Sequence, residues 1–309
     1  MKIVFMGTPG FSVGALKALV EGGYEVTAVV TQPDRPKGRG KGVACSPVKE
    51  YAVSKGIPVF QPVKIKTPEA VAELRTFEAD LFVVAAFGQI LSSEILHMPR
   101  YGCVNIHASL LPKYRGAAPI QWSIIDGEKE TGVTIMQMDE GLDTGDMLSK
   151  CIVPILDTDT ADSLHDKLME AGASLLLETI PQIENGTVTH EKQNDADSCY
   201  AKMLKKEMGR LDFSKDAIQL ERLIRGLNSW PGTFATLGDK TLKVIEARLS
   251  DVDYKGQPGE IVRVTRDAFY VACKSGTLEI ITVQPVGKRA MSVHDYLLGY
   301  PLREGERLQ

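Results

Sequence analysis

Residues 103–121 read CVNIHASLLPKYRGAAPIQ, and the first six of them have the pattern of a buried strand. Residues two apart in a strand project from the same face of a sheet. Asn105 and His107 therefore lie on one face, and Ile106 points to the other. The stretch predicts an amide and an imidazole side by side near the end of a strand.

Further along the chain, residues 141–146 read GLDTGD and place Asp143 in a glycine-bracketed loop. An amide donor can hold a developing oxyanion, a histidine can move a proton, and a carboxylate can orient that histidine. Asn105, His107 and Asp143 are therefore candidate catalytic residues for transferring an acyl-type group to an amine. Each also has an ordinary explanation: a structural histidine, a turn-forming asparagine and a common Gly/Asp loop. The catalytic interpretation depends on the three together.

Strand and helix patterns alternate on both sides of this stretch. Such alternation predicts a parallel α/β sheet, which binds ligands at the carboxyl ends of its strands. Asn105 and His107 fall at such an end. The predicted strands are residues 2–7, 24–32, 59–62, 79–88, 103–108, 131–139 and 147–155, and the predicted helices are residues 10–23, 46–56, 67–77, 117–127 and 160–186.

The C-terminal third has a different pattern. After a helix at 215–226, short strand-like runs at 241–249, 260–273 and 277–286 alternate with turn signals, which predicts a small β-barrel. Polar, unpatterned residues separate the two patterns. We therefore expect a Rossmann-like domain at 1–187, a linker at 188–205 and a barrel domain at 206–309.

Composition limits the class of protein. The net charge is −4, which gives no global sign of nucleic-acid binding, although residues 206–309 carry a net +2 and the rest a net −6. The mildly basic C-terminal part is compatible with an RNA partner and also with chance. Five scattered cysteines without a CxxC pair predict reduced thiols and no structural zinc. With no apolar run of membrane-spanning length and no signal-peptide pattern, we expect a cytoplasmic protein. We also expect a monomer, although no sequence pattern addresses the oligomeric state.

The blocks 105–121 and 131–148 resemble the folate-dependent formyltransferases. The resemblance covers nearly the whole chain and implies that the C-terminal barrel is OB-like. The sequence departs from the family pattern at Gly10, where an acidic residue is expected, and at Ser229, where proline often precedes Trp-Pro. Four further stretches are similar to the branch that formylates methionyl-tRNA: GTP (7–9), TQPDRPKGRGK (31–41), SPVK (46–49) and QPVGKRAM (284–291).

This resemblance implies transfer of a formyl group from 10-formyltetrahydrofolate, a cosubstrate, to the amino group of initiator methionyl-tRNA. Asn105 and His107 would donate hydrogen bonds to the tetrahedral oxyanion, His107 would move protons, and Asp143 would orient it, with no metal ion. Apolar residues on the loop after the strand suit an apolar ligand such as a pterin. The folate-binding residues implied are Ser109, Leu110, Leu111 and Pro112, with the backbone of Phe87 and Gly88.

Basic residues provide candidate RNA contacts. A charged loop is usually just solvated, but glycines give the segment 33–41 flexibility, and arginine suits phosphate. The resemblance implies that this segment grips the acceptor stem, with Arg39 as its central contact. The candidates are Arg35, Lys37, Arg39 and Lys41 in this segment, and Lys206, Arg210, Lys288 and Arg289 in the C-terminal part, where each alone is an ordinary exposed charge.

Two alternatives remain open. The chain could formylate a small amine, such as a sugar nucleotide or glycinamide ribonucleotide, although the basic segment argues against a small acceptor. It could also be a non-catalytic RNA-binding module, against which the intact Asn/His/Asp set argues. A nucleotide-binding loop at GTPG is disfavoured, because the stretch lacks both GxGxxG and GK[ST].

Overall fold

The computed structural model describes residues 1–36 and 43–309. They divide into two compact units, which we describe separately. No helix in these two ranges is long and apolar enough to cross a membrane. Unit 1 contains Met1–Pro119, Glu130–Pro154 and His165–Ala201, and unit 2 contains Ile120–Lys129, Ile155–Leu164 and Lys202–Gln309.

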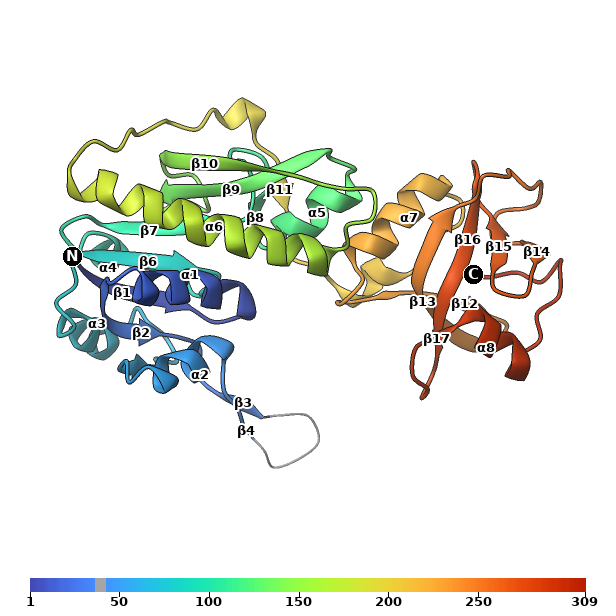
Figure 1. The fold of residues 1–309 in the computed structure, drawn as a ribbon, viewed down its shortest axis with the longest axis horizontal. Coiled ribbons are helices and arrows are strands. Elements are labelled where there is room, and N and C mark those ends of the chain that lie inside the picture. Colours follow the sequence, from blue (N-terminus) through green and yellow to red (C-terminus); the bar gives the residue numbers. More distant parts are fainter. Residues whose placement is uncertain (37–42) are drawn as a thin grey trace. The chain divides into compact units, whose positions relative to one another are not determined.

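A seven-stranded sheet forms the centre of unit 1, in the order β10-β9-β7-β6-β1-β2-β5 (Figure 1). The five strands from β7 to β5 are parallel, and β9 runs antiparallel to both of its neighbours, β7 and β10. Strand β6 is buried along its whole length, as a parallel strand covered on both faces should be. The predicted Rossmann-like α/β fold is confirmed. The strand bounds are β1 (Lys2–Gly7), β2 (Glu25–Val30), β5 (Val59–Phe60), β6 (Leu81–Ala85), β7 (Cys103–His107), β9 (Glu130–Gln137) and β10 (Met147–Pro154).

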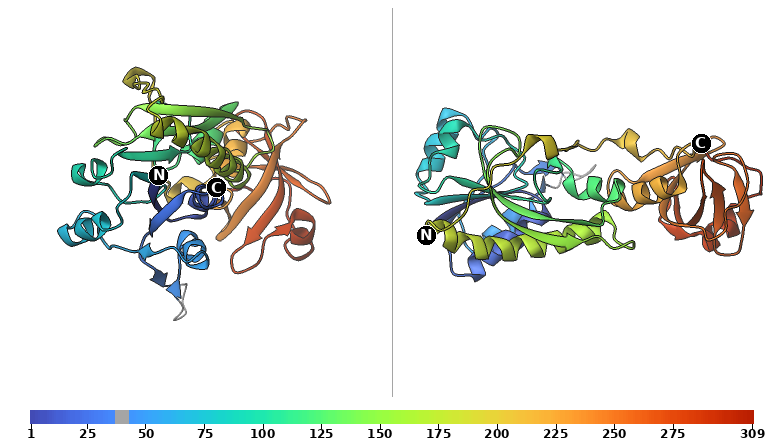
Figure 2. Two further views of the ribbon diagram at one scale, coloured as in Figure 1. Left: turned by 60° about the vertical axis from the view of Figure 1, so that its left-hand side comes forward. Right: turned by 90° about the horizontal axis from the view of Figure 1, so that it is seen from above.

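Helices cover both faces of this sheet (Figures 1 and 2). On one face, α6 approaches so closely that a Cβ at Gly172 would lie 3.0 Å from the Ile106 side chain. Helix α1 packs beside α6, with Gly14 against Met169. On the other face, α3 and α4 share an apolar cluster with β1, β2 and β6. The helix bounds in unit 1 are α1 (Gly10–Glu21), α2 (Pro47–Ser54), α3 (Pro68–Arg75), α4 (Ser93–Leu96) and α6 (Ala161–Glu184), whose first turn is assigned to unit 2. Helix α5 (Pro119–Ile125) lies almost entirely in unit 2.

Residues 188–201, expected as part of a linker, lie within unit 1. We call this segment the strap. It pairs with β10 through Glu191 and Met147, contains the 3-10 helix η1 (Asp195–Asp197), and ends in β11 (Tyr200–Ala201), which pairs with β8 (Arg115–Gly116). The polar residues of the strap therefore form hydrogen bonds within unit 1. Elsewhere in unit 1, a second short pair joins β3 (Arg35–Pro36) to β4 (Val43–Ala44).

Unit 2 is built on an antiparallel sheet in the order β12-β13-β16-β15-β14, with β17 paired to β16. The C-terminal segment 305–309 joins its edges, since Gln309 pairs with Thr236 and Glu306 accepts from the N–H of Ile261. The predicted small barrel is confirmed. The run expected at 260–273 is a hairpin, turned at 265–268, and β12 and α8 were not predicted. The bounds are η2 (Lys206–Gly209), α7 (Ala217–Gly226), β12 (Thr233–Leu237), β13 (Lys240–Leu249), β14 (Ile261–Val264), β15 (Phe269–Ala272), β16 (Thr277–Pro285), β17 (Met291–Ser292) and α8 (Val293–Gly299).

Candidate active site

Strand β7 carries Asn105 and His107 at the carboxyl edge of the sheet. Ile106 packs against α6, and Cys103 lies against the carbonyl of Ile95 at the end of α4, at 3.6 Å. Strand alternation therefore sends Asn105 and His107 to the face opposite α6, as the sequence predicted. Asn105 is half-buried, and its side chain makes no hydrogen bond with any described residue. Its amide is free to donate.

Cys103 is excluded as a nucleophile, although it shares this strand face. Burial raises the pKa of its thiol to about 12. The sulfur therefore stays protonated at neutral pH, and only the thiolate is a strong nucleophile.

A backbone carbonyl holds the imidazole of His107. Nε2 lies 2.9 Å from the carbonyl oxygen of Tyr114, and the residue is only 5% exposed. Because a carbonyl can only accept, Nε2 carries a proton. The neutral ring then has its lone pair on Nδ1. Nδ1 is therefore the nitrogen available for proton transfer.

Asp143 lies beside this imidazole without hydrogen bonding to it. Its Oδ2 is 3.8 Å from His107 Nδ1, beyond hydrogen-bond distance. The same oxygen accepts from the N–H of Gly116 at 2.8 Å. The structure thus brings two of the three candidate catalytic side chains together. The carbonyl of Tyr114 fixes the ring, and the orienting role of Asp143 stays a prediction.

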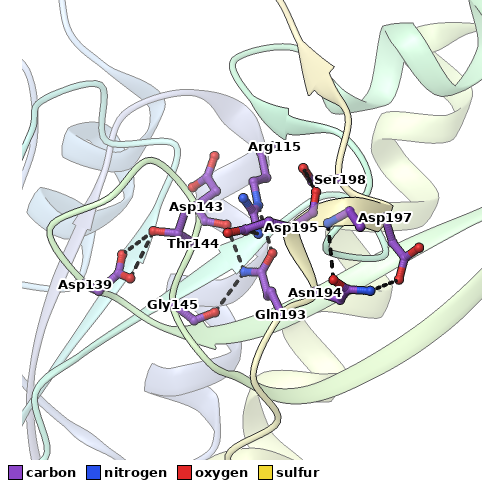
Figure 3. A network of polar contacts seen from close by, with 11 residues as sticks. Arg115, Asp139, Asp143, Thr144, Gly145, Gln193, Asn194, Asp195, Asp197 and Ser198 are labelled. Carbon is purple, nitrogen blue, oxygen red and sulfur yellow. Dashed lines mark hydrogen bonds and ion pairs between the residues drawn. The ribbon is translucent and has the colours of Figure 1, made fainter.

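The GLDTGD loop is a closed turn. The hydroxyl of Thr144 lies 2.8 and 2.9 Å from the two carboxylate oxygens of Asp139 (Figure 3). Asp139 also accepts from the N–H of Gly141 at 3.0 Å. A Cβ at Gly145 would collide with the carbonyl of Gln137, so this position requires glycine. Asp143, between these contacts, has a φ of 53°, in the left-handed region that non-glycine residues seldom occupy. Its conformation therefore depends on its surroundings.

The loop that follows β7 is held by Thr134 of β9. The Thr134 hydroxyl donates to the carbonyl of Ser109 at 2.7 Å and accepts from the N–H of Leu111 at 3.1 Å. The Ser109 hydroxyl donates to the carbonyl of Lys113 at 2.6 Å, and Leu111 is buried in a small cluster with Met136. Two of the predicted folate-binding side chains, those of Ser109 and Leu111, are thus engaged within the protein.

The other predicted folate-binding residues differ in accessibility. Phe87 is buried, and its carbonyl already accepts two side-chain hydrogen bonds, at 3.1 and 3.2 Å. Leu110 and Pro112 are partly exposed, and Gly88 is exposed. Of the six predicted folate-binding residues, Leu110, Pro112 and Gly88 are the ones with surface that a ligand could contact. A role in folate binding stays a prediction for the whole set.

Of the basic segment, Lys37, Arg39 and Lys41 lie outside the described residues, and Arg35 is exposed in β3. Its neighbour Asp34 accepts from Lys49 Nζ at 2.5 Å and from Gln61 Nε2 at 2.8 Å. These two donors hold the pKa of Asp34 below its ordinary value. Lys49 neutralises most of the negative charge of Asp34. Asp34 therefore offsets little of the positive charge on Arg35.

The C-terminal candidate cations are all exposed in unit 2. Lys206 begins η2 and Arg210 follows it, whereas Lys288 and Arg289 lie in the turn after β16. None of the four forms an ion pair with another residue of the described chain. Their surface is open to a polyanion, and contact with tRNA stays a prediction.

The structure adds site residues that sequence analysis missed. Tyr114 and Gly116 act through backbone groups, which have no sequence signature. Thr134 lies inside the block 131–148 that carries the family resemblance, so its position was visible but its partners were not. Gln193 was hidden in the predicted linker. Within the described ranges, no group of three or more His, Cys, Asp or Glu side chains is placed to hold a metal ion.

Comparison with known proteins decides the family. Residues 1–180 match the formyl transferase model, and residues 203–301 match the model of the formyl transferase C-terminal domain. A methionyl-tRNA formyltransferase of Agathobacter rectalis is 51% identical over 305 residues, which are 99% of this chain and 98% of that one. Another, of Citrifermentans bemidjiense, is 52% identical over 305 residues, 99% of this chain and 95% of that one. This chain belongs to the methionyl-tRNA formyltransferase family.

Solved structures agree on the fold of this family. An N-formyltransferase from Helicobacter canadensis, solved with folinic acid and dTDP-3-aminofucose, has a TM-score of 0.68 and 23% identity, covering 92% of this chain and 99% of that chain. Formyltransferases of this family use a folate-derived formyl donor. The predicted family and enzyme class are therefore confirmed.

Proposed function

We propose that this enzyme transfers the formyl group of 10-formyltetrahydrofolate to the amino group of initiator methionyl-tRNA. The observation that carries this proposal is the identity of about half of all residues, over both domains, with proteins named for that reaction. The pairing of His107 with Asp143 at the carboxyl edge of the sheet supports it, because acyl transfer to an amine needs a proton acceptor there.

The geometry of His107 supports the following reaction scheme. The methionyl amine attacks the formyl carbon, forming a C–N bond and a tetrahedral oxyanion to which the Asn105 amide donates. The Nδ1 lone pair of His107 accepts the proton that the amine loses. The resulting imidazolium can donate from Nδ1 to the oxyanion, and Asp143, 3.8 Å away, stabilises its charge. Transfer of that proton to N10 of the folate accompanies cleavage of the original C–N10 bond.

A comparison of acceptors tests the proposal. The wild-type chain is given 10-formyltetrahydrofolate with methionyl-tRNA, with an amino-sugar nucleotide, or with glycinamide ribonucleotide. We expect efficient formylation of methionyl-tRNA alone. Preference for a small amine would overturn the proposed acceptor, and no formylation of any amine would favour a non-catalytic RNA-binding module.

Arg39→Ala is expected to weaken the use of methionyl-tRNA while folate binding stays unchanged. Each phosphate contact releases counterions, so binding weakens as salt rises, and losing one contact should reduce the log–log salt slope by about 0.7–0.9. The measurements are tRNA affinity at several salt concentrations and kcat/KM for both substrates.

Arg75→Ala provides the matched control, because Arg75 is an exposed arginine on α3 that is ion-paired to Glu94. It should leave both substrates unaffected. Unchanged tRNA affinity and kcat/KM in Arg39→Ala would identify the basic segment as a solvated loop.

We propose 1–187 as the catalytic domain and 206–309 as a tRNA-binding domain, in a cytoplasmic monomer. Sedimentation at micromolar concentration tests the oligomeric state. That no catalytic metal is needed is tested by a transition-metal chelator, with Mg²⁺ retained for the tRNA.

A further inference from the structure

The side chain of Gln193, in the strap, holds the backbone of the GLDTGD loop. Its Nε2 donates to the carbonyl of Asp143 and to the carbonyl of Gly145, both at 2.8 Å (Figure 3). The two amide protons of Gln193 are thus both donated to backbone carbonyls. One carbonyl belongs to Asp143, which carries the candidate catalytic carboxylate, and the other to Gly145, two residues later. No other part of the proposed mechanism uses Gln193.

Arg115 fixes the orientation of this amide. Its Nε donates to Gln193 Oε1 at 2.9 Å, and its terminal nitrogen donates to Asp195 at 2.8 Å. A guanidinium can only donate and a carbonyl can only accept, so the amide cannot turn over without breaking all its contacts. Gln193 is therefore held from one side and holds Asp143 on the other (Figure 3).

The strap itself is anchored on both sides of Gln193. Before it, Glu191 exchanges two backbone hydrogen bonds with Met147, at 2.8 and 3.0 Å. After it, the carbonyl of Cys199 accepts from the N–H of Arg115 at 3.0 Å, and Cys199 Sγ accepts from the N–H of Tyr114 at 3.2 Å. The strap therefore fixes both the Asp143 loop and the segment whose carbonyl holds His107.

Asp143 needs such support because its conformation is uncommon. Its φ of 53° lies in the left-handed region, where a non-glycine residue persists only when its surroundings hold it. Its side chain has one close polar contact in the site, Gly116 N–H. The Gln193 amide, which Arg115 fixes, makes two hydrogen bonds to the backbone of this loop. These bonds would keep the Asp143 carboxylate facing His107 Nδ1.

We propose that Gln193 is a positioning residue for catalysis, which holds Asp143 beside His107 through the backbone of the loop. This inference rests on the proposed role of Asp143 in formyl transfer. Residues that only place a reacting group change the rate of the chemical step, and a displacement of about 1 Å can cost about a hundredfold. The strap then forms part of the active-site scaffold.

Gln193→Ala should lower kcat for formyl transfer about 10- to 100-fold and leave the KM values for folate and methionyl-tRNA within about twofold. Gln193→Glu sharpens the test, because it keeps an acceptor for Arg115 but has no donor for the two carbonyls. It should be at least as slow. Asn194→Ala is the matched control. Asn194 is the next residue, and among the described residues its side chain bonds only to Asp197 and Ala196, both in the strap, so the kcat of this variant should be unchanged. Thermal melts of every variant establish that it is folded at the assay temperature.

A double-mutant cycle separates positioning from a general loosening of the fold. If Gln193 acts through Asp143, adding Gln193→Ala to Asp143→Ala should change kcat by less than about twofold. The proposal is overturned by a kcat of Gln193→Ala within twofold of wild type, by a KM effect alone, by full activity of Gln193→Glu, or by an unreduced effect in the Asp143→Ala background. If the wild type instead prefers another amine, the proposed acceptor fails, and the same cycle can be run with that amine.

Discussion

His107→Ala is expected to lower the single-turnover rate of formyl transfer by about a thousandfold or more, with the protein still folded. General acid–base catalysis contributes about 10²–10⁴ in rate. His107 donates a hydrogen bond from Nε2 to the carbonyl of Tyr114, which leaves Nδ1 as a proton acceptor at the carboxyl edge of the sheet. Removing the ring removes both this acceptor and the imidazolium that follows.

His107→Gln is the matched variant for this experiment. A glutamine amide could still donate to the carbonyl of Tyr114, but it cannot exchange a proton at neutral pH. Both variants should be similarly slow when enzyme exceeds substrate, and circular dichroism should show native secondary structure. A rate within about threefold of wild type for either would remove His107 from the chemistry, because general acid–base catalysis is worth far more.

Asn105→Ala is expected to lower the rate constant of the chemical step by about a hundredfold to a thousandfold while folate affinity changes little. An oxyanion donor acts mainly in the transition state, so its loss affects the rate constant more than ground-state binding. The structure supports this role, because the half-buried Asn105 amide has no hydrogen-bond partner among the described residues. A donor without a protein partner is available to a substrate.

Folate titration together with single-turnover kinetics distinguishes the two roles of Asn105. Asn105→Asp keeps the shape but replaces the amide donor with a carboxylate, and it should be at least as slow as Asn105→Ala. A large loss of folate affinity with an unchanged chemical step would instead identify Asn105 as a cosubstrate ligand.

Local patterns predicted much of unit 1 correctly. Ser46 and Thr67, each followed by proline, accept from the N–H of Lys49 and Ala70 and so begin α2 and α3. Such caps involve groups three residues apart, so the signal lies within a few letters of sequence. The buried strands were recognisable for the same reason, because their apolar runs are continuous.

The strap was not predictable from local patterns. Polar residues without periodicity are typical of linkers, and 188–201 has that composition. Its hydrogen bonds reach far along the chain, however: Gln193 is 50 residues from Asp143 and 78 from Arg115. A polar side chain that bonds to a distant backbone looks the same in sequence as one that bonds to water.

Local patterns were enough to predict the two domain types and the shared face of Asn105 and His107, because strand alternation is a local property with a period of two. Which nitrogen of His107 is free, and where Asp143 points, depend instead on contacts between segments that are distant in the chain. The first depends on the carbonyl of Tyr114, and the second on the N–H of Gly116 and the amide of Gln193. Nearly every residue carries the same backbone donor and acceptor, so which of them meet is set by the packing of distant segments and not by any local pattern.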